Sequence, residues 1–142
     1  MVSLVPPAPL PRELHAFLRR PNAAVITTLR PDGHPHAAPT WYEWRDDTIL
    51  VNMDESRVRL GYMRRDPRVA LSIIDRNDWY NHVSVLGQVT EIREDVGLAD
   101  IDRLSLAYRG APYRNRERRR YSALVAPESW FVHGEPTAYD AS

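Results

Sequence analysis

The sequence predicts a mainly β fold of the α+β class, an antiparallel barrel of six or seven strands with short flanking helices. Short runs rich in β-branched and aromatic residues alternate with tight turns, and helical spacing of apolar residues is confined to a few short segments. Strand connections of two or three residues are too short for the crossovers of a parallel sheet. The 142 residues suffice for one domain. We expect a flexible Pro-rich leader over 1–11, the barrel over 12–133 and a tail over 134–142.

The first half of the chain predicts one helix followed by a three-stranded meander. Pro11 is a typical start for a helix over residues 12–20. The β-branched run that follows predicts a strand over 23–30, and Pro-Asp-Gly at 31–33 predicts a tight turn. The chain then returns as a strand over 34–44 and turns again into a strand over 48–53.

The second half alternates helices and strands. Ser56 is a candidate N-cap for a helix that ends before Pro67. Strands are expected over 69–75 and 79–93, and a helix over 97–109. The last two strands are predicted over 121–126 and 129–133.

Composition excludes several classes of chemistry. The chain has no cysteine and no lysine, and all 19 of its basic residues are arginine. Disulfides, thiolate nucleophiles, Schiff bases and P-loop chemistry are therefore excluded. The formal net charge is zero, which does not favour a nucleic-acid partner. No apolar run is long enough to span a membrane and no signal peptide is recognisable, so we expect a cytoplasmic protein.

The junction after the third strand carries an electrostatic anomaly. Arg57 and Arg59 are predicted in the first turn of a helix, where unpaired N–H groups favour anions over cations. A bound phosphate would resolve this, because it accepts bonds from backbone N–H groups and guanidinium groups together. The alternative is that Asp54 and Glu55 supply the compensating charge while both arginines remain solvated.

Aromatic side chains gather at two places. Trp41, Tyr42 and Trp44 lie on the second strand, where alternation places Tyr42 and Trp44 on one face. Trp79 opens the fifth strand. One face should fill the core, and the other could wall a flat ring system or meet a second subunit.

Other candidate motifs are weak. His34 and His36 share a strand face, but no third ligand stands at a suitable spacing, so we expect no metal site. No GxSxG motif and no Ser-His-Asp set can be found. The run RNRERRR, from Arg114 to Arg120, could bind nucleic acid or an acidic cofactor tail, or could be a solvated segment.

Several segments together resemble a known superfamily. They are TTLRPDGHPH at 27–36, WY at 41–42, the stretch 56–69, LGQV at 86–89 and YRG at 108–110. Their order and spacing are similar to those of the pyridoxamine 5′-phosphate oxidase-like split-barrel superfamily. The closer similarity is to its flavin/deazaflavin oxidoreductase branch, which uses coenzyme F420.

The resemblance implies a dimeric split β-barrel, with cofactor sites between the two subunits. Arg57 and Arg59 match the basic residues that hold the cofactor phosphate in the family. The ring would lie along the second and third strands, and Trp79 matches an aromatic of the pocket in deazaflavin-binding relatives. The implied cofactor-binding residues are Thr40, Trp41, Tyr42, Asn52, Met53, Arg57, Arg59 and Trp79.

The implied activity is transfer of a hydride from reduced F420 to an electron-poor small-molecule substrate. The cofactor carries this chemistry and the protein binds and orients it, so no catalytic acid is assigned, although Tyr42 could donate a proton. The acidic tail of F420 would find cations in the run 114–120. Two alternatives remain: an FMN-binding reductase or oxidase of the same fold, and a module that binds flavin or haem without turnover.

Overall fold

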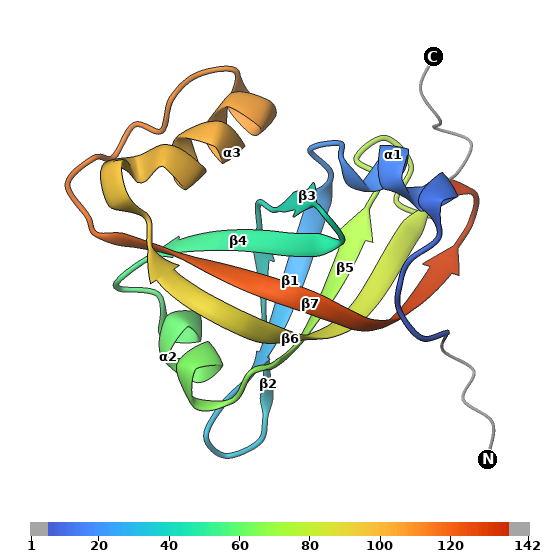
Figure 1. The fold of residues 1–142 in the computed structure, drawn as a ribbon, viewed down its shortest axis with the longest axis horizontal. Helices are drawn as coiled ribbons and strands as arrows, with labels where there is room; N and C mark the ends of the chain where they lie inside the picture. The colour runs from blue at the N-terminus through green and yellow to red at the C-terminus, as the bar shows by residue number, and fades with distance from the viewer. Residues whose placement is uncertain (1–5, 137–142) are drawn as a thin grey trace.

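The computed structural model describes residues 6–136 and folds them around one antiparallel sheet (Figure 1). The seven strands follow the order β2-β1-β5-β6-β7-β4-β3. In chain order the elements are η1 (Arg12–Leu14), α1 (His15–Leu18), β1 (Ala23–Leu29), β2 (Pro35–Thr40), β3 (Glu43–Arg45), β4 (Thr48–Asp54), α2 (Val58–Arg65), β5 (Arg68–Ile74), β6 (His82–Glu94), η2 (Val96–Leu98), α3 (Ala99–Arg109) and β7 (Arg120–His133). The predicted antiparallel, mainly β class is confirmed.

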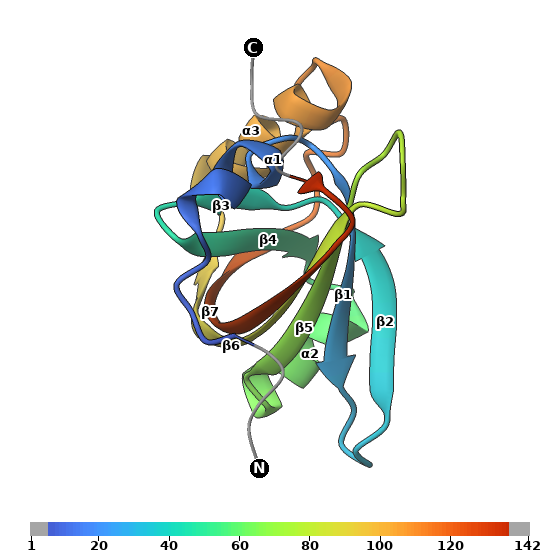
Figure 2. The same cartoon turned by 90° about the vertical axis from the view of Figure 1, so that its right-hand side faces the viewer.

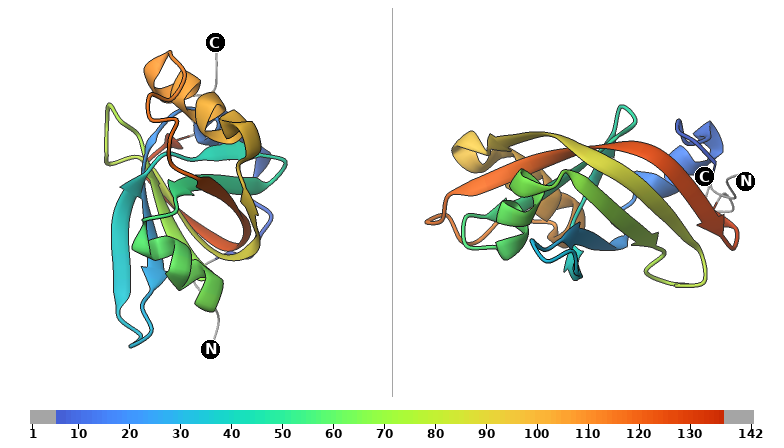
Figure 3. Two further views of the ribbon diagram at one scale, coloured as in Figure 1. Left: turned by 90° about the vertical axis from the view of Figure 1, so that its left-hand side faces the viewer. Right: turned by 90° about the horizontal axis from the view of Figure 1, so that it is seen from below.

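The sheet curls around a core that strand alternation builds. In β1 and β5 every second side chain points inward, so Ile26, Leu71 and Ile73 are fully or almost fully buried. The long strands β6 and β7 run side by side along their length (Figure 3). Because β2 and β3 form the two edges of the sheet, the barrel is open between them. Within the described part, no helix is long and apolar enough to cross a membrane.

The predicted meander is wrong, because the predicted strand 34–44 is two strands. β2 pairs with β1 and ends at Thr40, whereas β3 begins at Glu43 and pairs with β4 at the opposite edge. At the break, the backbone N–H of Tyr42 donates to the hydroxyl of Tyr108 at 3.3 Å instead of to a neighbouring strand. A contact with a residue so distant in sequence cannot be read from local alternation.

The two strands predicted over 121–133 form the single strand β7. Pro127 has no N–H to donate, and the pairing of β6 with β7 shifts register beside it, between Leu86 and Gly87. A Cβ on Gly87 would lie only 2.6 Å from the carbonyl oxygen of Ala126. The strand therefore continues through its proline because the partner strand offers a glycine at the irregularity.

The described part of the predicted flexible leader is docked on β7. Ala8 N–H donates to the carbonyl of Glu128 at 2.8 Å, and Trp130 N–H donates to the carbonyl of Pro6 at 3.0 Å. Leu10 is buried in the core. Prolines lack donors but keep their acceptor carbonyls, so a Pro-rich segment can still pair along one edge. Residues 1–5 and 137–142, including most of the predicted tail, lie outside the described residues.

Candidate functional site

A cavity of about 560 Å³ lies where the sheet is open. Its walls come from the start of β1, the end of β2, the end of β4 and the beginning of α2, with α3 and the segment that follows it on another side. Of the residues predicted to bind a cofactor, the lining includes Thr40, Trp41, Asn52, Met53, Arg57 and Arg59. The structure thus brings together side chains that the sequence places on separate strands.

The predicted helix at the junction forms, but begins later than expected. α2 starts at Val58 with Arg57 at the N-cap position, and no side chain caps it. Ser56 is not the cap. Its backbone N–H donates to Oδ1 of Asp54 at 2.8 Å, and its hydroxyl also contacts that oxygen. The Asp54 carboxylate therefore holds Ser56 in the turn before the helix, and the N–H groups of the first helical turn have no side-chain cap.

Arg59 is buried in the cavity wall and has few partners. It is 9% exposed, and its Nη2 donates to Oγ1 of Thr40 at 3.4 Å and to the carbonyl of Asn52 at 3.3 Å. Within residues 6–136, its Nε has no hydrogen-bond partner. Burial, followed by repulsion from Arg57 and Arg120, lowers the pKa of the Arg59 guanidinium. This end of the cavity therefore has more cationic groups than carboxylates to balance them.

Asp54 is the carboxylate shared by the arginines around it. Its oxygens lie 3.7 Å from Nε of Arg57, 3.8 Å from Nη1 of Arg118 and 3.9 Å from Nη1 of Arg120. Burial alone would raise the pKa of Asp54, but the hydrogen bonds from Ser56 and the nearby arginines lower it below its usual value. One carboxylate thus faces several guanidinium groups, which leaves excess positive charge for an anion.

The middle of the cavity is apolar and suited to a flat group. β1 and β2 contribute the small residues Ala23, Ala24, Ala38 and Pro39 to its lining. The Trp41 ring stacks on Tyr108, with centroids 5.2 Å apart and planes 12° apart, and meets Tyr113 edge-on at 6.1 Å. Such a combination of small side chains and stacked aromatic rings leaves room for another planar ring.

The structure places Tyr42 in the core and outside the cavity lining. Its side chain is 3% exposed and lies in the core with Trp44. The hydroxyl donates to the carbonyl of Leu18 at 2.7 Å and accepts a bond from Nδ2 of Asn22 at 3.0 Å. Burial raises the pKa of Tyr42. Alternation correctly puts Tyr42 and Trp44 together, but on the core side, so Trp41 is the aromatic that faces the cavity.

Trp79 does not line the cavity of its own chain. It lies in the loop between β5 and β6, which stands away from the sheet in Figure 2, and is 76% exposed. The predicted strand over 79–93 begins only at His82, so Trp79 is outside the ladder that would have fixed its direction.

The arginines of the run 114–120 have different surroundings. Arg116 pairs with Asp102 at 2.9 Å, and Arg119 pairs with Glu94 at 3.2 Å, so these are surface ion pairs. Arg120 is 7% exposed and lines the cavity, with its guanidinium 4.5 Å from the centre of the Tyr113 ring. Arg114 borders a separate hollow of about 210 Å³.

The two histidines of the second strand do not gather further metal ligands. His34 is exposed and its Nδ1 lies 3.3 Å from Oδ1 of Asp32, whereas the ring of His36 meets Tyr62 edge-on at 5.6 Å. Among residues 6–136, no group of three or more His, Asp or Glu side chains could hold a metal ion.

Several lining residues were not predicted from the sequence. Arg76 lines the cavity from the β5–β6 loop, and α3 contributes Ile101, Leu104 and Tyr108. The helical period of α3 shows that it has an apolar face, but nothing local shows that this face meets Trp41 and Leu50 of β4. The alanines of β1 and β2 could have indicated the cavity from the sequence, because small side chains in a strand allow a ligand to approach the sheet closely.

A family model described as pyridoxamine 5′-phosphate oxidase matches residues 10–133. This match covers nearly all of the described chain. The chain belongs to the pyridoxamine 5′-phosphate oxidase family.

Solved structures place this family member among split barrels. A structure named F420 reductase is 26% identical, with a TM-score of 0.77 over 86% of this chain and 98% of that chain. A putative pyridoxamine 5′-phosphate oxidase from Listeria innocua is 15% identical, with a TM-score of 0.63 over 84% of this chain and 94% of that chain. General stress protein 26 from Bacillus anthracis is 18% identical, with a TM-score of 0.61 over 85% and 91%. No curated protein matches the chain significantly.

Proposed function

We propose that this protein is an oxidoreductase that binds a deazaflavin of the F420 type and directs its hydride to an electron-poor small molecule. The observation that carries the proposal is the buried Arg59, whose Nε lacks a partner within the described residues at the cationic end of an apolar cavity. The 26% identity to a structure named F420 reductase supports the choice of cofactor.

The residues of the cavity fit such a cofactor in two parts. Arg57, Arg59 and Arg120 would hold the phosphate through charge-assisted hydrogen bonds. The small residues of β1 and β2 and the ring of Trp41 would hold the flat ring system. When bound, the deazaflavin supplies a hydride at its reduced ring.

The chain itself binds, orients and excludes water. The Trp41–Tyr108 stack fixes one side of the apolar middle, and the Tyr108 hydroxyl donates to the carbonyl of Asn22 at 2.7 Å. That hydroxyl is thereby committed to the backbone, and burial raises its pKa to about 12. We therefore assign Tyr108 to positioning and leave proton supply to water or substrate.

The acidic tail of F420 would meet further cations beside the cavity. Arg109 and Arg114 border the smaller hollow, which shares Tyr113 with the main cavity. In the described part of the chain, neither arginine has a carboxylate within ion-pair distance. They are better placed for this role than Arg116 and Arg119, which are already paired.

We also propose that the protein is a homodimer with its cofactor sites between the two subunits. Leu86 and Phe131 are 52% and 47% exposed and lie as diagonal neighbours on the outer face of β6 and β7. Exposed apolar residues grouped in this way favour a protein interface. In a dimer, the exposed Trp79 would be available to the cavity of the other subunit.

FMN binding on the same fold is the second candidate function. The family model carries the name of an oxidase and matches residues 10–133, and a phosphate-bearing flavin would use the same arginines.

Titration of the purified full-length protein with F420 and with FMN separates the two functions. The two cofactors differ in absorbance and fluorescence, so each binding curve is read directly. We expect tighter binding of F420, and faster oxidation of reduced F420 by an electron-poor acceptor when the protein is present. Tight binding of FMN alone would replace the first function by the second. Binding without turnover, across a panel of acceptors, would leave only a binding module.

A further inference from the structure

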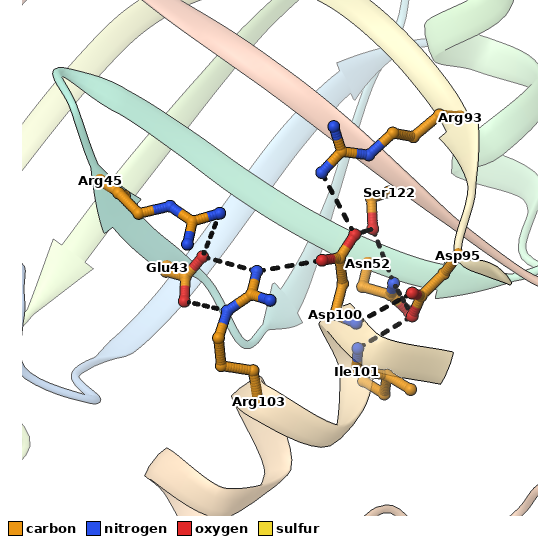
Figure 4. A network of polar contacts seen from close by, with 9 residues as sticks. All are labelled: Glu43, Arg45, Asn52, Arg93, Asp95, Asp100, Ile101, Arg103 and Ser122. Carbon is orange, nitrogen blue, oxygen red and sulfur yellow. Dashed lines mark hydrogen bonds and ion pairs between the residues drawn. The ribbon is translucent and has the colours of Figure 1, made fainter. Parts of the chain in front are cut away.

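A buried polar network joins β4, β7 and the start of α3 beneath the cavity (Figure 4). The carboxylate of Asp95 accepts bonds from the backbone N–H groups of Asp100 and Ile101, both at 2.9 Å. Its Oδ2 also accepts a bond from Nδ2 of Asn52 at 3.1 Å. One carboxylate therefore holds the first turn of α3 and a side chain of the cavity wall at the same time.

The orientation of the Asn52 amide is fixed by this network. Nδ2 donates to Oδ2 of Asp95 and to Oγ of Ser122 at 3.0 Å, and the Ser122 hydroxyl donates to Oδ2 of Asp100 at 2.7 Å. With both amide hydrogens used, Oδ1 of Asn52 faces the other way and accepts a bond from Nε of Arg120 at 2.8 Å. If the amide were reversed, Oδ1 would face the Asp95 carboxylate and Nδ2 would face the Arg120 Nε–H group, and both hydrogen bonds would be lost.

We propose that Asp95 and Asn52 are positioning residues that hold the Arg120 guanidinium in the anion-binding end of the cavity. The inference rests on the proposed function, in which Arg120 contacts the cofactor phosphate. Nε of Arg120 donates to Asn52, and the guanidinium lies over the Tyr113 ring. Its terminal nitrogens therefore remain available to Asp54 and to a bound anion. A chain of directed bonds of this kind pre-organises a charged group before its ligand arrives.

The same network couples the two parts of the cavity. Asp95 caps the helix that supplies Ile101, Leu104 and Tyr108 to the apolar middle, and through Asn52 it also orients the arginine of the phosphate end. Docking of α3 and binding of the phosphate are therefore linked, and by reciprocity each stabilises the other.

The first test uses the cofactor-free protein and the NMR signal of the Arg120 Nε–H group. In the variant Asp95→Asn, one of the two acceptor oxygens becomes an NH2 group, so the side chain cannot accept from Asn52 and from both backbone N–H groups of α3 at once. We expect solvent exchange of the Arg120 Nε–H to become at least about tenfold faster, because a buried charge-assisted bond is lost. Asn52→Ala, which leaves the cap of α3 intact, should give the same result.

The matched control is Glu43→Gln. Glu43 makes the bidentate ion pair with Arg103 of α3, at 2.7 and 2.9 Å, and Arg103 also donates to Oδ1 of Asp100 at 3.0 Å (Figure 4). Among the described residues, Glu43 makes no hydrogen bond or ion pair with Asp95, Asn52 or Arg120. This change weakens the attachment of α3 and leaves the direct bonds among Asp95, Asn52 and Arg120 in place. Exchange at Arg120 should remain as in the wild type. Equal acceleration in Glu43→Gln and Asp95→Asn would show that Arg120 merely responds to loosening of α3, and would overturn the inference.

The second test compares F420 with the deazaflavin riboside that lacks the phosphate. We expect Asp95→Asn to weaken F420 binding about tenfold and riboside binding clearly less, since only the phosphate uses Arg120. Equal weakening of both ligands would reduce Asp95 to a structural residue. If the wild type binds neither ligand, the proposed function fails, while the exchange measurement still decides whether Asp95 and Asn52 position Arg120.

Discussion

A guanidinium as deeply buried as that of Arg59 usually contacts a carboxylate at short range. Within residues 6–136, Arg59 has no such ion pair, and its two hydrogen bonds, at 3.3 and 3.4 Å, go to neutral oxygens. Repulsion from Arg57 and Arg120 adds to the cost of its burial. An arrangement that costs stability without a ligand is typical of a binding site.

The first prediction is that Arg59→Met stabilises the cofactor-free protein. The methionine keeps an unbranched apolar side chain and removes the buried charge, so we expect the free energy of unfolding to rise by about 1 kcal/mol. Urea denaturation measures this. Arg57→Met is the control, since the Arg57 side chain is 65% exposed, and it should change stability by less than about 0.5 kcal/mol. A clear loss of stability in Arg59→Met would mean that Arg59 is a structural residue.

At the scale of elements, α3 is attached to the barrel largely by side chains far from it in sequence. Tyr108 donates to the carbonyl of Asn22, accepts from the N–H of Tyr42 and stacks on Trp41. Burial raises the pKa of Tyr108 from 10.0 to about 12. The folded protein therefore holds this proton at pH values where the unfolded chain has lost it. The stabilisation is complete below pH 10 and is lost as the pH rises towards 12.

The second prediction follows from this pKa. Between pH 8 and pH 11.5 the wild type should lose about 2 kcal/mol of stability through Tyr108, and Tyr108→Phe should show a shallower decline. Urea midpoints measured across this range give the two slopes. Tyr108→Phe should keep a residual slope, because burial also raises the pKa of Tyr42. Tyr80→Phe, at a 59% exposed position, should match the wild type. Equal slopes for Tyr108→Phe and wild type would contradict the assignment.

Elements whose evidence was local could be predicted from the sequence. The β4–α2 junction was identifiable because Arg57 and Arg59 conflict with a helix start, and the strands β1 and β5 because of their alternation. The break between β2 and β3 could not be predicted, since it depends on Tyr108, 66 positions from Tyr42. The fixed orientation of Asn52 depends on Asp95, 43 positions away, and could not be predicted for the same reason.

At the scale of the whole molecule, the open side of the barrel gives the cavity, and the outer face of β6 and β7 gives the proposed interface. Leu86 and Phe131 are exposed there although they belong to the two longest strands of the sheet. Such positions carry no cost in a dimer, because apolar area removed from water stabilises association.

The third prediction concerns this face. Leu86→Arg should convert the dimer into monomers, since it places a charge in an apolar contact, and light scattering coupled to gel filtration gives the mass. Val96→Arg is the control, at a 76% exposed position on η2. A wild type that is monomeric at micromolar concentration would remove the proposed dimer, and a dimer unaffected by Leu86→Arg would place its interface elsewhere.

The most direct test of the central claim, that the arginine-lined end of the cavity holds a cofactor phosphate, is the ratio of the dissociation constants of the phosphate-free deazaflavin riboside and F420. We predict that Arg57→Ala and Arg59→Ala each weaken F420 binding by about 1.5–3 kcal/mol, the range for charge-assisted hydrogen bonds, and leave riboside binding unchanged. Arg30→Ala should change neither constant, because Arg30 lies outside the cavity beside Asp32. If Arg57→Ala and Arg59→Ala retain the wild-type ratio as Arg30→Ala does, the phosphate does not bind at Arg57 and Arg59 and the account is wrong.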